Sequence, residues 1–326
     1  MRLLRTLTEP KLRGKTCLVR VNLDVKDPIG DSLRLQAALP TLRFLLEHGA
    51  KPIIISHRGR PEGEDSALSL KRAVSLIEKE LGCAVEWREN LRFDPREEAN
   101  NVAFAKGLAQ GADIYINDDF ATSHRKAASM VAITEFLPSY AGLHLEEEIK
   151  NLSRVRDNPD YPRVVILGGI KIEDKIGVIQ RFENAGTKFL LGSAYRMSPE
   201  ALPRHADIVF AKDGIGGNAW QDIGVKTTEE YEKIIAKAKT VVWSGPVGKA
   251  ENAKYAKGSQ ALAGAIIKSK AFSVAGGGDT ADFLQKEGLI KKFDWVSTGG
   301  GAMLAFLSGE KLYGLTALET AEKERD

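Results

Sequence analysis

The feature that most constrains the fold is a repeated alternation of short apolar segments with longer amphipathic ones. The apolar segments have about the length of strands, and most end in glycine or polar residues; they cover 16–25, 51–57, 113–118, 163–169, 187–192, 240–245 and 271–278. Helical periodicity follows several of them, as in 33–49. Strands without polar alternation are typical of parallel sheets that helices cover on both faces. The pattern therefore predicts an α/β protein of the doubly wound kind.

The chain is long enough for two domains, because 326 residues with 43% hydrophobic content can bury two separate cores. A charged helical stretch at 143–156 leads into a proline-containing exit and then into the apolar segment 163–169. We expect a linker helix at 143–156 with a hinge, an N-terminal lobe over 1–142 and a C-terminal lobe over 157–310. Each would be a Rossmann-like three-layer lobe with a parallel sheet.

Overall charge and cysteine usage exclude some classes of function. Forty-seven basic and 44 acidic residues give a net charge of +3, which does not suggest nucleic-acid binding. Cys17 and Cys83 lie in β-like apolar runs without metal-ligand spacing, which favours reduced thiols. No segment has the apolar length of a signal peptide or a membrane span. We expect a cytoplasmic protein that binds neither nucleic acid nor membrane.

In the first half, cationic residues stand where apolar segments stop or helices begin. They are Arg20, Arg34, His57, Arg60, Arg92, His124 and Arg125. Strand ends form the ligand crevice of open α/β sheets. Guanidinium groups bind carboxylate or phosphate with two parallel hydrogen bonds, so the set predicts a site for a small polyanion. Any one of these arginines taken alone is more simply a solvated surface charge.

In the second half, glycines stand at the strand ends. GGIKIEDK, SGP, GGGDT and STGGGA each follow or precede a predicted element, so backbone N–H groups would gather at one crevice and cradle phosphate. Neither GxxxxGK[ST] nor GxGxxG accounts for them. Lys171 and Lys175 would share one helix face and reach phosphate oxygens, or form an ordinary solvated pair. Asp279 would be a helix N-cap or a magnesium ligand.

The chain resembles the phosphoglycerate kinase family over nearly its whole length. The strings that carry the resemblance are RVNLDV, LRLQAALPT, SHRGRP, ENLRF, INDDFATSHR, GGIKIEDKIGVI, VVWSGPVG, GGGDT and STGGGA, in the family's order. The resemblance implies a monomeric glycolytic kinase that moves a phosphoryl group between 1,3-bisphosphoglycerate and ADP, with Mg²⁺ and ATP/ADP. It also implies hinge closure and a C-terminal tail, 311–326, that packs back on the first lobe.

The resemblance carries roles to individual residues. Those implied to bind 3-phosphoglycerate are Arg20, Asn22, Asp24, Arg34, His57, Arg60, Arg92 and Arg125. Those implied in catalysis are Arg34, Lys171 and Lys175. Those implied to bind nucleotide are Gly169, Lys171, Lys175, Gly245, Glu251, Gly276, Gly277, Gly278, Asp279, Thr280, Gly299 and Gly300, with Asp279 at the magnesium ion.

The chain departs from the family pattern at three places. Asn22 and Asp24 exchange the family's aspartate and asparagine, and we expect both on one face of a strand. Ser244 replaces an asparagine, and Lys249-Ala250 replaces an apolar pair. Between 192 and 220, several tens of residues of the family are missing. This deletion predicts a loosened adenine pocket, unless Tyr195, Met197 or Trp220 rebuilds its wall by stacking.

Two alternatives follow from the same sequence. The shortened second half suggests a catalytically inactive relative that binds anions or a partner, although Arg34, Lys171, Lys175 and Asp279 are retained. The doubly wound pattern alone suggests a nicotinamide-dependent oxidoreductase, against which the missing GxGxxG counts. An assay with ATP and 3-phosphoglycerate separates the three hypotheses.

Overall fold

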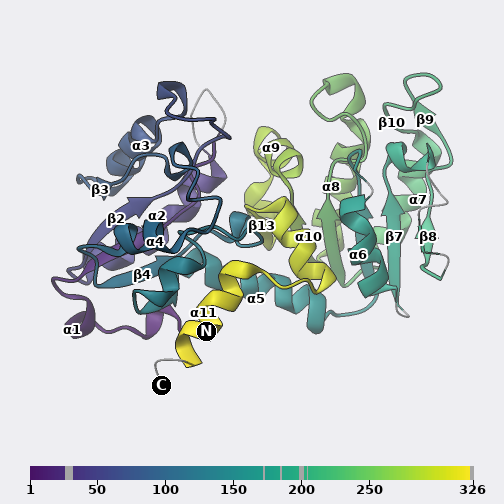
Figure 1. The fold of residues 1–326 in the computed structure, drawn as a ribbon. Helices are drawn as coiled ribbons and strands as arrows, with labels where there is room; N and C mark the ends of the chain where they lie inside the picture. The colour runs from purple at the N-terminus through teal and green to yellow at the C-terminus, as the bar shows by residue number, and fades with distance from the viewer. Residues whose placement is uncertain (26–31, 172, 184–185, 198–201, 204, 324–326) are drawn as a thin grey trace. The chain divides into compact units, whose positions relative to one another are not determined.

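The computed structural model describes residues 1–25, 32–171, 173–183, 186–197, 202–203 and 205–323. The chain divides into two compact units (Figure 1). Unit 1 comprises Met1–Ile149 and Lys311–Asp326, and unit 2 comprises Lys150–Glu310. The division falls inside helix α5 (Leu143–Asp157), which covers the stretch predicted to be a helix between the lobes.

Among the described residues, unit 1 contains a five-stranded parallel sheet in the order β3-β2-β1-β4-β5. Its strands are β1 (Thr16–Arg20), β2 (Lys51–Ile55), β3 (Glu86–Trp87), β4 (Ile114–Asn117) and β5 (Ser139–Ala141). Every residue of β4 is buried, as are all but the first of β1 and β2, because helices cover the sheet. The continuous apolar runs of the sequence arise from this burial.

The helices of unit 1 are α1 (Glu9–Leu12), α2 (Leu33–Glu47), α3 (Lys71–Leu81), α4 (Val102–Ala109) and α11 (Tyr313–Lys323), together with the first part of α5. The Ser32 side chain caps α2 by accepting a hydrogen bond from the backbone N–H of Arg34, 3.3 Å away. Helix α3 ends at Gly82, whose left-handed backbone (φ +73°) suits a residue without a side chain. Thus local sequence signals fix where α2 begins and where α3 ends.

Unit 2 repeats this plan with a six-stranded parallel sheet in its described residues, in the order β13-β12-β11-β6-β7-β8. The strands are β6 (Arg163–Leu167), β7 (Thr187–Leu191), β8 (Ile208–Val209), β11 (Thr240–Ser244), β12 (Phe272–Gly276) and β13 (Trp295–Ser297). A small antiparallel pair, β9 (Gly214–Ile215) and β10 (Asp222–Ile223), lies in the shortened segment. Trp243 of β11, fully buried, packs against Phe283 and Phe293 in the core.

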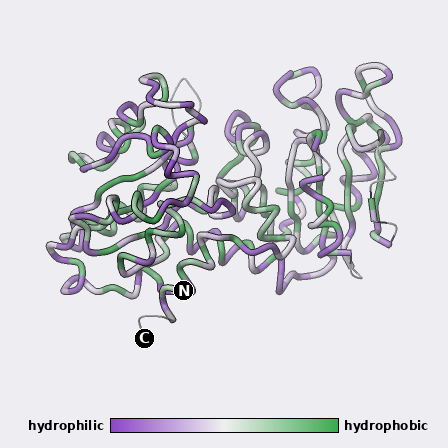
Figure 2. Tube along the Cα trace, viewed as in Figure 1, coloured by the Kyte–Doolittle hydropathy of each residue, from purple (hydrophilic) through white to green (hydrophobic). Residues whose placement is uncertain are grey.

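The helices of unit 2 are α6 (Glu173–Phe182), α7 (Val225–Ile235), α8 (Lys257–Ser269), α9 (Gly278–Lys286) and α10 (Gly300–Ser308), with the end of α5. Helix α6 packs against α10, and α7 packs against α8. Figure 2 shows that hydrophobic residues follow the strands, whereas many exposed loops and helix faces are hydrophilic.

The predicted α/β fold class with parallel sheets is confirmed, and both sheets share one topological feature. In unit 1 the strand order reverses between β1 and β4, and in unit 2 it reverses between β6 and β11. Ligands of open α/β sheets bind at the carboxyl edge beside such a reversal. The sequence patterns found the central strands but missed β3, β5, β8 and β13, which are only two or three residues long.

The C-terminal helix α11 belongs to unit 1. The backbone N–H of Gly314 donates to the Ser123 carbonyl, 2.9 Å away. A Cβ at residue 314 would lie 2.9 Å from Ser123 Oγ and 3.0 Å from Asn117 Nδ2, so the close approach requires glycine. The tail therefore contacts the polypeptide just beyond the end of β4.

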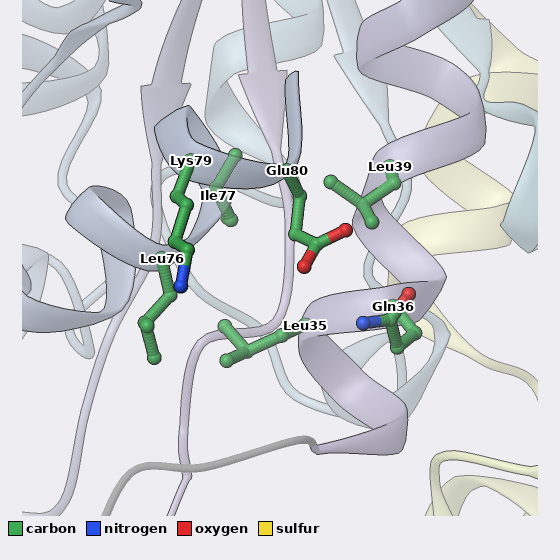
Figure 3. A pocket seen from close by; sticks show the side chains of 7 residues that line it. All are labelled: Leu35, Gln36, Leu39, Leu76, Ile77, Lys79 and Glu80. Atoms are coloured by element: carbon green, nitrogen blue, oxygen red, sulfur yellow. The ribbon is translucent and has the colours of Figure 1, made fainter. Parts of the chain in front are cut away.

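Two further observations bear on function. A cleft of about 230 Å³ lies between α2 and α3 (Figure 3), and its lining consists of helix residues: Leu35, Gln36, Leu39, Leu76, Ile77, Lys79 and Glu80. These residues belong to α2 and α3 themselves, not to the strands or the loops that follow them. No helix among the described residues is long and apolar enough to cross a membrane.

Candidate functional site

Arg20, the last residue of β1, holds together the carboxyl edge of the sheet in unit 1. It is 2% exposed, and its guanidinium group donates to Ser129 Oγ (3.0 Å), to the Val21 carbonyl (2.9 Å) and to His57 Nδ1 (2.8 Å). It also forms a buried ion pair with Asp119, at 3.2 Å. Because most of its donors are committed to the protein, Arg20 is suited to positioning its neighbours.

His57 follows β2 and is almost fully buried. Since arginine can only donate, His57 Nδ1 must accept from Arg20, and the ring proton is on Nε2. Burial, together with the positive charges of Arg20, Arg92, Arg125 and Arg34, holds the pKa of His57 well below its ordinary value of 6.5. His57 is therefore a neutral hydrogen-bond donor at physiological pH, with Nε2 3.9 Å from Asp24 Oδ2.

Asn22 and Asp24 were predicted to lie on one face of a strand, and this is wrong. Strand β1 ends at Arg20, and both residues lie in the loop beyond it. Asn22 Oδ1 accepts from the backbone N–H of Asp24 at 3.1 Å, so the two form a turn rather than one strand face. Asn22 Nδ2 donates to Asp119 Oδ1 at 3.0 Å, and Asp24 Oδ1 accepts from the Gly59 N–H at 2.9 Å. Asp24 thereby joins the loops that follow β1 and β2.

Arg34 stands in the first turn of α2, with its side chain partly buried. Its guanidinium group donates to the backbone carbonyl of Asp24 and lies 3.9 Å from the Asp24 carboxylate. The structure thus brings Arg34, Asp24 and His57 together. Among the described residues, these contacts leave other N–H groups of Arg34 available for a ligand.

Arg92 and Arg125 line a cavity of about 280 Å³ together with Arg20, Glu97, Glu98, Thr122, Lys126 and Ala127. Arg92 donates to the Gly59 carbonyl at 2.7 Å. Glu98, an exposed residue, lies 3.1 Å from Arg92 Nε and 3.9 Å from Arg125 Nη1. A carboxylate therefore already stands between two of the arginines predicted to bind an anion.

Arg60 is not joined to this group: it is exposed, and no contact among the described residues connects its side chain to the other arginines. Sequence reasoning also missed the residues that support the cluster. Ser129 Oγ accepts from Arg20 and donates to Glu97 Oε1 at 2.5 Å, and Ser56 Oγ accepts from the Leu23 N–H at 2.9 Å. A sequence signal for this supporting network is the acidic pair in INDDFATSHR, which includes Asp119, the ion-pair partner of Arg20.

In unit 2, the turns that follow β6, β7 and β11 pack backbone against backbone. A Cβ at Gly168 would lie 1.9 Å from the Pro246 carbonyl oxygen, and a Cβ at Gly245 would lie 2.4 Å from the Gly168 oxygen. Gly192 approaches the Gly168 Cα in the same way. Gly168 and Gly192 therefore serve close packing of the chain, and so does Gly245, which was predicted to bind nucleotide.

The glycines around α9 and α10 divide into two kinds. Gly276 and Gly300 face close neighbours: a Cβ there would lie 2.4 Å from Met303 Sδ and 2.5 Å from the Gly277 Cα, respectively. Gly277 (φ +107°) adopts a left-handed backbone, and Gly278 faces open space. Gly278 begins α9, whose first N–H groups favour an anion. Gly299 precedes α10 as its N-cap residue.

Asp279 and Thr280 lie in the first turn of α9. Gly277 occupies the N-cap position, so Asp279 is not the cap, and its side chain is exposed. Thr280 is fully buried, and its Oγ1 accepts from the Gly245 N–H at 2.8 Å. Thr280 therefore ties α9 to the turn after β11. Glu251, predicted to contact the ribose, is exposed in the loop beyond β11.

Lys171 and Lys175 do not share a helix face, because α6 begins at Glu173 and Lys171 lies exposed in the preceding turn. Lys175 is buried in the first turn of α6. Its Nζ donates to the Gly168 carbonyl and to Tyr195 Oη, the latter at 2.7 Å. Burial lowers the pKa of Lys175 to about 8, while the carboxylates of Asp174 and Asp279 act in the opposite direction.

Of the residues suggested to rebuild an adenine wall, the structure describes the surroundings of Tyr195 and Trp220. Tyr195 is 2% exposed, and its hydroxyl donates to the Gly168 carbonyl at 2.9 Å, so its ring is not open for stacking. Trp220 packs over Gly214, where a Cβ would lie 2.3 Å from the indole. The Met197 side chain lies outside the described residues.

The carboxylates of the described residues decide whether a magnesium ion fits these positions. The described residues contain no group of three or more His, Cys, Asp or Glu side chains that could hold a metal by themselves. Asp279 nevertheless offers one exposed carboxylate beside the glycine turns. Mg²⁺ commonly takes one or two carboxylates and completes its shell with phosphate and water, so this donor fits a nucleotide-borne ion.

Fold and sites together define an α/β enzyme class that acts on small phosphorylated molecules: one doubly wound unit gathers guanidinium groups at its carboxyl edge, and the other gathers glycine turns and a lysine. The family model described as "Phosphoglycerate kinase" matches residues 7–89, 87–198 and 183–310. The chain belongs to the phosphoglycerate kinase family. The predicted kinase class, a phosphotransferase with a carboxyl acceptor, is thereby confirmed, and the alternative of an inactive relative receives no support.

Relatives and solved structures agree with this membership. The phosphoglycerate kinase of Coprothermobacter proteolyticus is 34% identical, with 97% of this chain and 98% of the relative covered. That of Dictyoglomus turgidum is 36% identical, with 96% and 98% covered. The crystal structure of phosphoglycerate kinase from Pyrococcus horikoshii is similar with a TM-score of 0.86 at 28% identity, covering 99% of this chain and 100% of that one. The structure from Coxiella burnetii gives 0.81 at 29%, covering 97% and 98%.

This chain is a shortened member. Its alignment with the Coprothermobacter relative extends over 387 positions, although the chain has 326 residues, so the relative carries segments that this chain lacks. Two of the matched segments meet within 183–198, next to the stretch where the sequence predicts the deletion.

Proposed function

We propose that this chain catalyses reversible phosphoryl transfer from 1,3-bisphosphoglycerate to ADP, giving 3-phosphoglycerate and ATP. The observation that carries the proposal is the cluster of Arg34, His57, Arg92 and Arg125 at the carboxyl edge of unit 1. The acceptor in the reverse direction is a carboxylate, which is ionised near neutral pH and needs no general base. The mechanism therefore needs no histidine that accepts a proton. This fits His57, which is neutral and whose Nε2–H is a hydrogen-bond donor.

In this proposal the cations of unit 1 bind 3-phosphoglycerate by charge and by directed hydrogen bonds. Arg92, Arg125 and Arg60 would contact its phosphate, and His57 Nε2–H, Asn22 and Asp24 would contact its carboxylate and hydroxyl. Arg34 would reach the transferring phosphoryl group, where charge is spread over three oxygens in the transition state. Arg20 would act by holding His57, through the 2.8 Å hydrogen bond to Nδ1.

Unit 2 would bind the nucleotide. Lys171, Lys175, Gly169 and the N–H groups at Gly277 and Gly278 would contact phosphates, while Glu251 would contact the ribose. Asp279 would hold Mg²⁺ through the nucleotide, and the ion would neutralise charge on the phosphate oxygens. Gly245, Gly276, Thr280 and Gly300 would shape this site through their packing rather than by contact with the ligand.

The wider organisation is part of the same proposal. We place a substrate lobe at 1–142, a linker helix at 143–156, a nucleotide lobe at 157–310 and a returning tail at 311–326, with a hinge that closes to exclude water from the acyl phosphate. A monomer in the cytoplasm is the corresponding expectation. Sedimentation velocity at several protein concentrations tests the monomer.

The function is tested by a coupled assay in both directions. ATP, Mg²⁺ and 3-phosphoglycerate should give ADP formation that depends on all three, and 1,3-bisphosphoglycerate with ADP should give ATP. A preparation that binds 3-phosphoglycerate but yields no turnover in either direction would contradict the proposal. Omitting 3-phosphoglycerate controls for simple ATP hydrolysis.

A further inference from the structure

Lys175 and Tyr195 form a closed hydrogen-bonded triangle with the carbonyl of Gly168. Lys175 Nζ lies 2.7 Å from Tyr195 Oη, the Tyr195 hydroxyl lies 2.9 Å from the Gly168 oxygen, and Lys175 Nζ also donates to that oxygen. All three groups are buried or lie in the backbone. Because they come from α6, from the segment after β7 and from the turn after β6, the triangle fixes three elements at one point.

The donors and acceptors of this triangle have only one consistent arrangement. A charged lysine has three N–H donors and accepts none, so Tyr195 must accept from Lys175 with its oxygen and give its own proton to Gly168. Within the described part of the chain, two N–H groups of Lys175 are then used, and one remains. Nζ also lies 3.4 Å from where a Cβ at Gly169 would be, so the ammonium faces the left-handed turn at that glycine.

We propose that Tyr195 is a positioning residue for Lys175: with the Gly168 carbonyl, its hydroxyl holds the lysine ammonium at the turn after β6 and leaves the third N–H for a phosphate oxygen of the nucleotide. The proposal rests on the function proposed above for unit 2. It gives Tyr195, one of three residues that the sequence offered for stacking on the base, a role toward the phosphates instead.

The physical consequence concerns the charge of Lys175. A hydroxyl that accepts from an ammonium stabilises its charged form, and burial opposes that form. The groups that act on Lys175 are the carboxylate of Asp174 on its own helix, the carboxylate of Asp279 on α9 and the Tyr195 hydroxyl. Removal of the hydroxyl should therefore make Lys175 lose its proton at a lower pH.

The direct test is the nitrogen-15 NMR titration of Lys175 Nζ in the full chain without nucleotide. The resonance is assigned by its loss in Lys175→Met. In the parent the midpoint should lie near pH 8. Tyr195→Phe should move it down by about one pH unit, the size expected for one lost hydrogen bond to a charged group. An unchanged midpoint would overturn the proposal, and this measurement does not depend on turnover.

Tyr231→Phe is the matched control. Tyr231 is also buried in unit 2, and its hydroxyl lies 2.8 Å from the carbonyl oxygens of Leu191 and Val209, but it contacts no lysine in the described residues. It should leave the Lys175 midpoint where the parent has it. If Tyr231→Phe shifts the midpoint as much as Tyr195→Phe does, the effect is a general loosening of unit 2 and the proposal fails.

The kinetic counterpart is the pH profile of kcat/KM for ATP. At pH 8, Tyr195→Phe should lower kcat/KM about fivefold, because about half of Lys175 is charged in the parent and about a tenth in the variant. At pH 6.5 the two proteins should agree within about twofold, because Lys175 is then mostly charged in both. An equal loss at every pH would indicate a structural role and contradict the proposal. If the parent has no turnover, the proposed function fails, while the NMR titration still decides the role of Tyr195.

Stability measurements supply a further test that needs neither turnover nor an assigned resonance. The lowered pKa of Lys175 means that its buried charge costs stability fully below about pH 8, and that this cost disappears as the pH rises towards 10.5. Lys175→Met should therefore raise the melting temperature at pH 7, and the gain should shrink at higher pH. Tyr195→Phe should lower the melting temperature more in the parent than in Lys175→Met. Equal losses in both backgrounds would show that the two side chains are not coupled.

Discussion

The two units have the same topology, but their strand-end sites consist of different chemical groups. Unit 1 uses side chains: Arg20, His57 and Arg92 are linked by hydrogen bonds and ion pairs to neighbouring loops. Unit 2 uses mainly the backbone, with turns at Gly168 and Gly245 in direct contact and one buried lysine. A site of charged side chains can be altered without changing the path of the chain, whereas a site of packed turns cannot. The two sites should therefore respond differently to mutation and to salt.

The largest effect is expected at Arg34. Arg34→Ala should lower kcat by about 10²-fold or more, because a preorganised donor aimed at the transferring group acts mainly in the transition state. Binding of 3-phosphoglycerate should weaken much less. Steady-state kinetics and calorimetry measure the two quantities. Arg43→Ala, in the same helix but with its side chain bonded to the Glu80 carbonyl, is the control. Loss of binding alone, with kcat unchanged, would remove Arg34 from the chemical step.

The backbone character of unit 2 is tested by a pair of glycine substitutions. Gly168→Ala should destabilise the protein by more than about 3 kcal/mol, because its Cβ would meet a backbone oxygen that has no space to move. Gly278→Ala faces open space and should leave the melting temperature nearly unchanged while weakening ATP binding. Thermal unfolding and nucleotide titration of both variants measure these effects. Similar stabilities for the two variants would contradict the distinction between packing and ligand-facing glycines.

Recognition of the base should be weaker than recognition of the phosphates. The Tyr195 ring is buried, so it offers no open face for a base to stack on. Rejection of a wrong base needs buried polar groups that the wrong base leaves unpaired. GTP should substitute for ATP with a loss in kcat/KM of roughly tenfold or less. The comparison is made for ATP, GTP and ITP at one magnesium and salt concentration. A preference for ATP above a thousandfold would show that base recognition is intact.

The smallest effect is expected at Glu98. Its carboxylate stands between Arg92 and Arg125, so an anionic substrate must displace it. Glu98→Gln should therefore strengthen 3-phosphoglycerate binding by about threefold, the size expected for an exposed ion pair. Glu47→Gln, an exposed change at the end of α2, is the control. Weaker binding in Glu98→Gln would mean that Glu98 supports the arginines rather than competing for them.

The sequence was sufficient for the parallel α/β architecture and for the strand ends beside which the candidate residues stand. Continuous apolar strands specify parallel, covered sheets, and the cations and glycines at their ends mark the carboxyl edges. The short edge strands were not predictable, since two or three residues show no period. Asn22 and Asp24 were misplaced because the pattern does not show that β1 ends at Arg20.

The partners of buried groups were also beyond the sequence. The contact of Lys175 with Tyr195 joins residues 20 positions apart, and the network of Arg20 with Ser129 and Glu97 joins still more distant ones. Such pairs depend on which strand ends meet in space. A sequence motif can locate a functional lysine, but not the hydroxyl that holds it.

The central claim is that unit 1 binds 3-phosphoglycerate by charged side chains, independently of the nucleotide site. Calorimetric titration of the full chain with 3-phosphoglycerate, without nucleotide and at two salt concentrations, tests it most directly. Affinity should fall as salt rises, because partly exposed charges are screened. Arg92→Gln should abolish most of the binding, and Lys175→Met should leave it unchanged. A salt-independent affinity, or an equal loss in Lys175→Met, would contradict the account.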